Sequence, residues 1–293
     1  MNFSRIRFCI IFILLIALSA ASNADNSAEY ALIIIADGLR PDAIDKARTS
    51  NLYSLIKQAS YTNTAKTVEL AMTLPSLTSI ITGLKPENHG MTGNKYSPDL
   101  GHTQFVTIFS AANKDGLSTA MFVGKDKLGY LNVPGSLDHY ESTNMAPDSV
   151  ELITQSYTGY LKKHKPRLAL VHFPYPDLAG HKHGWMSGEY MDSLESVDKA
   201  LGKIIASLKE TGIYDNAFIV IVSDHGGEGK THLKDMPNTR LIPWLAIGKN
   251  VKKDYRISWQ VYIYDTAPTV LRALGLTPPP GIDGRVIEEI FLK

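Results

Sequence analysis

Short apolar runs that end in polar residues constrain the fold of this chain more than any other feature. Three of them lie at residues 31–36, 167–172 and 216–222, and Ile, Val, Leu and Ala fill most of their positions. Continuous runs of this kind are typical of strands that are buried on both faces of a parallel sheet. They indicate a central sheet that is covered on both sides.

Helical patterns alternate with these runs along the chain. We expect helices at residues 49–60, 73–82, 105–113, 148–163, 189–210 and 265–275, and further strands at residues 118–123 and 241–247. No internal repeat, long linker or low-complexity segment interrupts this order. The alternation predicts an α/β fold with a single doubly wound sheet and helices on both faces.

The beginning of the chain differs in character from the rest. Arg5 and Arg7 precede an apolar run at residues 8–18, and small residues follow it. This order predicts a secretory signal peptide at residues 1–24, a mature domain at residues 25–293, and an exported protein that is periplasmic or secreted. The alternative is a membrane anchor, but the run is shorter than the ~20 residues that a spanning helix needs.

The charge of the mature chain limits its partners. The only cysteine, Cys9, lies in the predicted signal peptide, so no disulfide is expected. Removing Arg5 and Arg7 reduces the 30 Lys and Arg to 28, against 29 Asp and Glu, which leaves a net charge of −1. A balance this close to neutrality predicts no surface for nucleic acids or acidic membranes.

Acidic residues and histidines stand where the predicted strands end. Asp37 follows the first run, and Asp224 and His225 follow the run at 216–222, with His232 in the same glycine-rich loop. Because ligands bind at the carboxyl ends of strands in open α/β sheets, these residues are candidate site residues. Each also has a purely structural explanation, such as a turn or a helix cap.

A second pair of candidates follows the run at 167–172. Asp177 and His181 are four residues apart, so one helical turn would place both side chains on one face. With the three residues above and His232, the candidates comprise three carboxylates and three imidazoles. This ligand set fits zinc, in preference to manganese or iron, and its size suits two ions. Two such ions can clamp the attacking and leaving oxygens of a displacement at phosphorus.

Hydroxyl, amide and ammonium groups occur near the same predicted edge. Thr73 begins a predicted helix, where free N–H groups suit an anionic ligand, although a simple N-cap is the alternative. Asn94 lies in a turn-rich loop and could donate a hydrogen bond to a substrate. Lys125 and Lys127 follow the predicted strand at 118–123 and could contact an anion, although a solvated turn also explains them.

Six motifs occur in a fixed order along the chain: Asp37-Gly38 after the first strand, Thr73-Leu-Pro-Ser, Thr82-Gly83 through His89-Gly90, Pro176-Asp177 through His181, Ser223-Asp-His-Gly226 and Asp265-Thr-Ala-Pro-Thr269. This ordered set resembles the alkaline phosphatase superfamily and, within it, the type I phosphodiesterase and nucleotide pyrophosphatase group. The resemblance implies an alkaline-phosphatase-like catalytic domain with two zinc ions. One ion would be held by Asp37, Thr73, Asp224 and His225, and the other by Asp177, His181 and His232.

The resemblance also implies a mechanism for a small-molecule phosphate ester. Thr73 would attack phosphorus to form a phosphothreonine, which water then hydrolyses. Asn94, Lys125 and Lys127 would bind the nonbridging oxygens. His89 and His183 match no ligand position, and we expect them to be structural.

The substrate class is less constrained. Nucleotide-cleaving relatives usually carry phenylalanine after the threonine, and Leu74 stands there in this chain. Lys125 and Lys127 look like the lysine element of threonine-dependent monoesterases and phosphonoacetate hydrolases, and two cations suit a dianion. We therefore expect a phosphomonoesterase, with a phosphodiesterase or nucleotide pyrophosphatase as the alternative.

Other proteins of the fold fit less well. A sulfatase would need cysteine or serine at the position of Thr73, and a phosphoethanolamine transferase would be expected to bring several membrane spans. From a different class, a non-catalytic metal- or phosphate-binding protein that keeps the fold remains an alternative.

Overall fold

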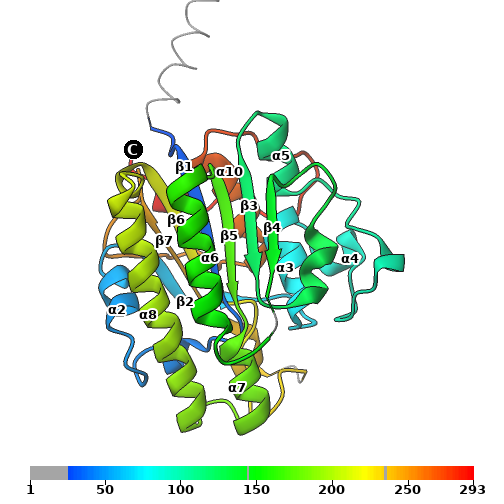
Figure 1. Ribbon diagram of the computed structural model, residues 1–293, viewed down its shortest axis with the longest axis vertical. Coiled ribbons are helices and arrows are strands. Elements are labelled where there is room, and N and C mark those ends of the chain that lie inside the picture. Colours follow the sequence, from blue (N-terminus) through cyan, green and yellow to red (C-terminus); the bar gives the residue numbers. More distant parts are fainter. Residues whose placement is uncertain (1–25, 144, 234–235) are drawn as a thin grey trace, which may run out of the picture.

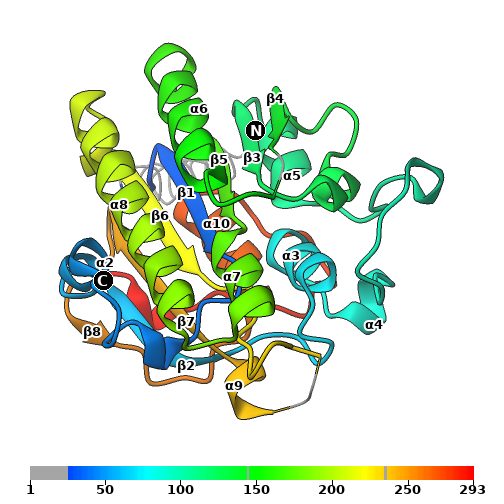
Figure 2. The same cartoon turned by 60° about the horizontal axis from the view of Figure 1, so that its bottom comes forward.

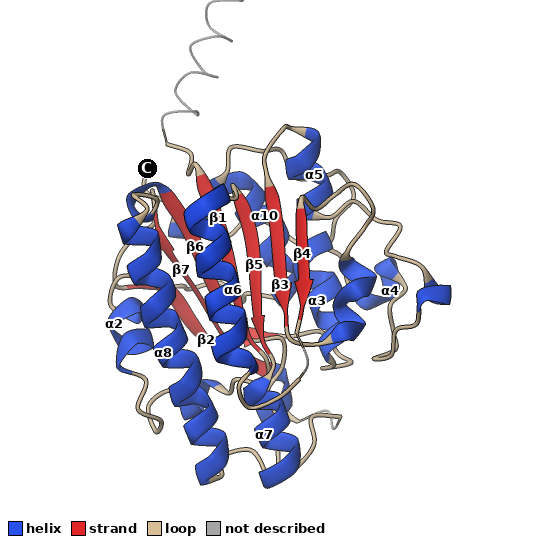
Figure 3. Ribbon diagram, viewed as in Figure 1, coloured by secondary structure: helices blue, strands red, loops and turns tan. Residues whose placement is uncertain are grey.

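The structure is a computed structural model that describes residues 26–143, 145–233 and 236–293. Its centre is an eight-stranded mixed sheet with the strand order β4-β3-β5-β1-β6-β7-β2-β8 (Figures 1 and 3). The strands are β1 (Tyr30–Ala36), β2 (Ser60–Lys66), β3 (Thr119–Val123), β4 (His139–Ser142), β5 (Leu168–Phe173), β6 (Ala217–Val222), β7 (Leu241–Gly248) and β8 (Tyr255–Arg256).

The apolar runs identified in the sequence form the middle of this sheet. β1 pairs in parallel with β5 on one side and β6 on the other, and β3 pairs in parallel with β5. Every residue of β3, β5 and β6 is buried. The parallel strands therefore all finish at the same edge, which the sequence predicted to carry the site.

Helices cover both faces of the sheet, as expected for a doubly wound fold. The helices are α2 (Ser50–Ile56), α3 (Thr73–Thr82), α4 (Pro86–His89), α5 (Ile108–Lys114), α6 (Ser149–His164), α7 (Tyr175–His183), α8 (Gly188–Glu210), α9 (Pro237–Arg240) and α10 (Thr266–Ala273). Apolar residues of α3, α5 and α10 pack on one face, and those of α2, α6, α7 and α8 pack on the other (Figure 1). The predicted alkaline-phosphatase-like α/β architecture is confirmed.

The strands at or next to the edges of the sheet depart most from the sequence prediction. We expected a helix over residues 49–60, but α2 ends at Ile56 and β2 begins at Ser60. β2 is a polar strand, Ser-Tyr-Thr-Asn-Thr-Ala-Lys, that pairs antiparallel with β7. Its side chains are only partly buried, so it lacks the apolar run that identified the central strands. The short strands β4 and β8 escaped notice for the same reason.

The predicted signal peptide lies outside the described residues and stays a prediction, as do the domain bounds. None of the helices in the described part of the chain combines the length and the apolar character that a membrane span requires.

Candidate metal centre

Side chains from three neighbouring strand ends meet at one edge of the sheet. Asp37 directly follows β1, Asp224 and His225 follow β6, and α7 begins two residues after β5. Since β5, β1 and β6 are adjacent and parallel, their carboxyl ends converge, as expected for a site in an α/β fold. Figure 2 turns this edge toward the reader, with α7 and α3 around it.

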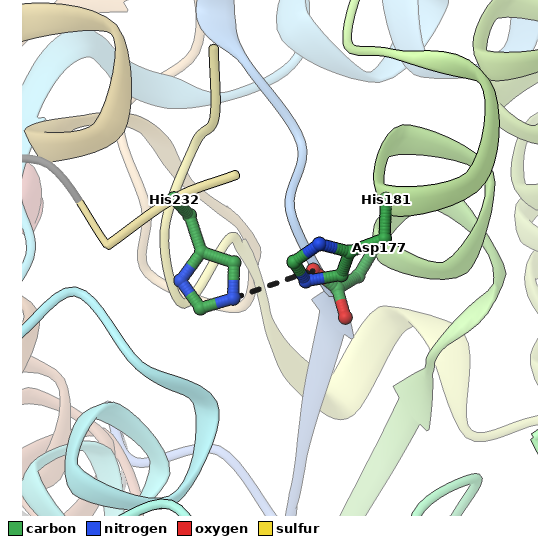
Figure 4. A group of neighbouring side chains, drawn as sticks. All are labelled: Asp177, His181 and His232. Carbon is green, nitrogen blue, oxygen red and sulfur yellow. Dashed lines mark ion pairs between the residues drawn. The ribbon is translucent and has the colours of Figure 1, made fainter. Parts of the chain in front are cut away.

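One cluster joins α7 to the loop after β6. His181 Nε2 lies 3.3 Å from Asp177 Oδ1, and His232 Nε2 lies 3.9 Å from the same oxygen (Figure 4). One ligand atom from each of these three residues lies within 4.8 Å of the others, a spacing that could hold a metal ion. The prediction that one helical turn brings Asp177 and His181 to one face agrees with α7.

A second cluster lies deeper and shares Asp177 with the first. It comprises Asp37, Asp177 and His225, whose ligand atoms also lie within 4.8 Å of one another. His225 Nε2 is 3.5 Å from Asp37 Oδ1 and 3.4 Å from Asp224 Oδ2. These three residues and the neighbouring Asp224 are all buried, so solvent provides little compensation for their polar atoms.

The three carboxylates share one pattern. In each, the protein binds one oxygen and leaves the other without a partner: Asp37 Oδ1, Asp177 Oδ1 and Asp224 Oδ2. The satisfied oxygen of Asp224, for example, accepts from the backbone N–H groups of Gly38 and His225. Buried unpartnered acceptors are costly unless another ligand satisfies them. The free oxygens therefore fit a bound cation.

The three histidines share a pattern of their own. In each ring Nδ1 lies near a backbone carbonyl oxygen, at 3.0 Å for His181, 2.9 Å for His225 and 2.7 Å for His232. A carbonyl only accepts, so Nδ1 carries the hydrogen and Nε2 presents a lone pair. Backbone support of this kind orients metal-binding histidines. Burial also lowers the pKa of His232 to about 3, which keeps this ring neutral.

One buried lysine lies among the negatively charged carboxylates. Lys125 Nζ lies 2.6 Å from Asp37 Oδ2, 2.6 Å from Asp177 Oδ2 and 3.1 Å from Thr73 Oγ1. Burial lowers the pKa of Lys125, but the carboxylates of Asp177, Asp37 and Asp224 outweigh it and raise the pKa above its ordinary value. Burial and the charge of Asp37 raise the pKa of Asp224 to about 6. Excess negative charge in a buried site favours a further cation.

The predicted nucleophile and amide lie beside this cluster. Thr73 is the first residue of α3, and the N-cap is Met72, so Thr73 is not the cap. Asn94 Oδ1 accepts from the Leu74 N–H at 3.1 Å and from Lys127 Nζ at 2.8 Å. The amide oxygen of Asn94 is thereby committed, and its NH2 group is the part that can donate to a substrate.

Other side chains considered above lie outside the two clusters. His89 contacts Ser79 Oγ at 3.0 Å within the core, and His183 lies 3.4 Å from Glu189. Leu74 is fully buried in the core beneath α3, so it contributes to packing. Its identity is therefore weak evidence about the substrate. Sequence reasoning missed one site residue, His172 of β5, whose Nε2 lies 2.8 Å from Asp37 Oδ2.

Glycines allow the loop after β6 to pass close to its neighbours. A Cβ at Gly227 would lie 2.1 Å from Trp185 Cε2, and one at Gly226 would lie 2.1 Å from the Asn238 carbonyl oxygen. Trp185 Nε1 in turn donates to the carbonyl of Gly38, next to Asp37. Close packing in this loop thus contributes to the position of the deeper cluster.

Replacing Gly227 by alanine is expected to lower the free energy of unfolding by about 1–3 kcal/mol, because the new methyl group overpacks against Trp185. Denaturant unfolding measures this effect. Gly159→Ala in α6 is the matched control, since a Cβ there meets open space. That change should instead stabilise by ~0.5–1 kcal/mol through helix propensity. Equal stability of the two variants would contradict the packing argument.

The fold defines a class, the alkaline-phosphatase-like α/β proteins, and the two clusters give this chain aspartates and histidines that could hold metal ions. Within this class, the chain belongs to the type I phosphodiesterase / nucleotide pyrophosphatase family, whose model matches residues 31–236.

Known proteins agree with this assignment. The chain is 27% identical over 241 residues to a bis(5'-adenosyl)-triphosphatase of Xenopus laevis, covering 76% of this chain and 53% of the relative. It is 27% identical to human ectonucleotide pyrophosphatase/phosphodiesterase family member 1, covering 69% of this chain and 23% of that protein. The chain thus spans about half the length, or less, of these curated relatives.

Solved structures show the same fold. An inactive variant of murine ectonucleotide pyrophosphatase/phosphodiesterase 5, in complex with AMP, superposes with a TM-score of 0.72 at 16% identity, covering 90% of this chain and 100% of that chain. A 2-O GAG sulfatase gives a TM-score of 0.73 at 14% identity, covering 89% of this chain and 73% of that chain. At these identities the likeness extends to the fold alone.

Proposed function

We propose that this protein is a metal-dependent hydrolase of phosphoric esters, of the phosphodiesterase or nucleotide pyrophosphatase type, with Thr73 as the nucleophile. The observation that carries the proposal is the set of unpartnered buried ligand atoms beside Thr73: Asp37 Oδ1, Asp177 Oδ1, Asp224 Oδ2 and His225 Nε2. Family membership supports the same reaction, since the curated relatives are named as enzymes that cleave phosphoric esters and anhydrides.

The donor set fits two zinc ions. Asp37, Asp224 and His225, with the Thr73 hydroxyl, would hold the inner ion, and Asp177, His181 and His232 would hold the outer ion. Carboxylate oxygens and neutral imidazoles suit zinc, as they do in other hydrolases. Bound there, such ions act as Lewis acids on phosphoryl, attacking and leaving oxygens.

The chain's own groups prepare the displacement. The Thr73 hydroxyl loses its proton to solvent, and its oxygen forms the new bond to phosphorus while the bond to the leaving oxygen breaks. Water later cleaves the bond between Thr73 and phosphorus, which releases a phosphomonoester or nucleoside monophosphate and restores the hydroxyl. Lys125 Nζ, 3.1 Å from Thr73 Oγ1, stabilises negative charge on this oxygen. The Asn94 NH2 group and Lys127 bind nonbridging oxygens of the substrate. The start of α3 adds the positive end of a helix dipole.

The family favours diesters or pyrophosphates over the monoesters that the two lysines suggested. Its description and the names of the relatives refer to phosphodiester and pyrophosphate cleavage. Leu74 is buried in the core, so its identity reflects packing and does not exclude a nucleotide substrate. We therefore propose the alternative set out above, cleavage of a diester or a nucleotide pyrophosphate.

Parallel turnover of bis-nitrophenyl phosphate and nitrophenyl phosphate by the zinc-loaded protein tests this preference. We expect a higher kcat/KM for the diester. A higher value for the monoester would restore the phosphatase assignment. No turnover of either substrate would favour a metal- or phosphate-binding protein.

Loss of the positive charge on Lys127 is expected to limit activity at alkaline pH. Burial, followed by the charge of Lys125, lowers the pKa of Lys127 to about 8. The ammonium form predominates below this pKa and is lost as the pH rises through it. Since the cation binds an anionic substrate, kcat/KM should fall above pH ~8. Lys127→Arg, which stays charged, should remove this decline from the pH profile, and a profile of Lys127→Met identical to wild type would contradict this role.

A further inference from the structure

We propose that His172 is a positioning residue that holds the carboxylate of Asp37 as a one-oxygen ligand for the inner metal ion. This inference rests on the metal sites of the proposed function. His172 is not itself a ligand in this arrangement, because its ring contacts the far oxygen of Asp37.

His172 occupies a place where an apolar residue would be expected. It lies in β5, level with Ile35 of β1 on one side and Val123 of β3 on the other. Its side chain is fully buried, and the alternate residues Leu168 and Leu170 point into the core on the same face. A polar ring in such a position is costly unless both nitrogens are hydrogen-bonded.

The neighbours of the ring assign its tautomer. The backbone N–H of Gly124 points at His172 Nδ1 at 3.4 Å, and this N–H can only donate. Nδ1 is therefore the acceptor and Nε2 carries the hydrogen. Nε2–H then donates to Asp37 Oδ2 at 2.8 Å. This is the opposite tautomer to that of His181, His225 and His232, whose Nε2 atoms face the site with lone pairs.

The hydrogen bond determines which oxygen Asp37 presents. Oδ2 accepts from His172 Nε2 and forms an ion pair with Lys125 Nζ at 2.6 Å, whereas Oδ1 is buried without a hydrogen-bond partner and lies 3.5 Å from His225 Nε2. The carboxylate cannot rotate without losing both the hydrogen bond to His172 and the ion pair with Lys125. Oδ1 is thereby held toward the cluster that would bind the inner ion.

Lys125 and His172 both contact Asp37 Oδ2, but they are not equivalent in orienting this carboxylate. Lys125 Nζ sits at the end of a flexible side chain and also contacts Asp177 and Thr73. The His172 ring is fixed between strands, and its Nδ1 is tied to Gly124, the residue before Lys125. One ring therefore links the ends of β1, β3 and β5, which are consecutive in the sheet order. Groups that orient a ligand in this way typically account for 10–100-fold in metal affinity.

The test is a zinc titration of the metal-free protein against a chromophoric chelator, for wild type and for His172→Leu, His172→Asn and His172→Gln. Glutamine can place an N–H near the position of Nε2, whereas asparagine is too short and leucine has no donor. We expect the inner ion to bind about 10–100-fold more weakly in the leucine and asparagine variants, and within about threefold of wild type in the glutamine variant. The outer ion should be affected less.

A buried histidine elsewhere provides the matched control. His89→Leu also removes a hydrogen-bonded core histidine, one that contacts Ser79 and the Met91 N–H. It should lower the unfolding temperature but leave both zinc affinities unchanged, which separates positioning from general destabilisation.

The outcomes distinguish this inference from the proposed function. Wild-type protein that binds no zinc would defeat the metal sites themselves. Wild-type binding with unchanged affinity in folded His172→Leu would overturn the role of His172 alone. If the leucine variant does not fold, equal affinities of His172→Asn and His172→Gln would overturn it.

Discussion

Replacing Thr73 by alanine is expected to reduce hydrolysis by about three orders of magnitude or more, because removal of a covalent nucleophile leaves only binding and electrostatic effects. Thr73 is buried at the start of α3 and its Oγ1 contacts Lys125 Nζ at 3.1 Å. The carboxylates and imidazoles of both clusters remain in the variant. Steady-state kinetics on the preferred ester, with zinc content measured on the same sample, should therefore show metal-loaded but inactive protein.

Two further variants isolate the hydroxyl. Thr78→Ala removes a buried threonine of the same helix, whose Oγ1 donates to the Leu74 carbonyl at 2.7 Å, and should preserve hydrolysis at some cost in stability. Thr73→Ser retains a hydroxyl and should retain part of the rate. Full activity of Thr73→Ala would exclude the covalent mechanism and favour direct attack of water on phosphorus.

Removing metal is expected to abolish hydrolysis and to lower the unfolding temperature by ~10 °C. Zinc at a thousandfold excess over its dissociation constant stabilises the folded state by ~4 kcal/mol, and each kcal/mol shifts the midpoint of a domain this size by ~2–4 °C. In the metal-free protein the free oxygens of three carboxylates stay buried without partners, which is the physical source of the effect. Calorimetry after chelation and after zinc addition measures it.

Two aspartate variants, one at the proposed site and one away from it, test the source of this effect. Asp177 belongs to both clusters, so Asp177→Asn should reduce the zinc-induced shift strongly. Asp198→Asn removes a buried aspartate that bonds the start of α2, away from the site, and should lower stability while preserving the shift. Activity that survives chelation, or equal shifts in both variants, would contradict the metal assignment.

The sequence predicted the central part of this fold and site because both depend on strong local signals. The continuous apolar run before Asp37 identified β1, and the run before Asp224 identified β6. Residues that follow such strands must gather at one edge, whatever the details of packing. Asp177 and His181 were paired by helical spacing, and α7 has that geometry.

The parts that escaped prediction depend on contacts between distant residues. His172 ends an apolar run and carries no motif, so its hydrogen bond to Asp37 becomes visible only when β5 lies beside β1. Its one signal in the sequence is a histidine at an inward-facing strand position. β2 is polar, and its pairing with β7 joins segments about 180 residues apart. Nor could spacing alone indicate that Lys125 bridges two of the predicted ligand carboxylates.

The unequal exposure of the two clusters has a consequence for the order in which ions enter and leave. The His181 side chain is 42% exposed, whereas those of Asp37 and His225 are 0% exposed. Water could therefore replace a ligand of the proposed outer ion without any movement of the sheet, whereas the proposed inner ion would be enclosed by strand ends. We expect the outer ion to exchange with solvent first and the inner ion to exchange slowly behind it. A brief exposure to chelator should then yield a protein with a single, kinetically trapped ion.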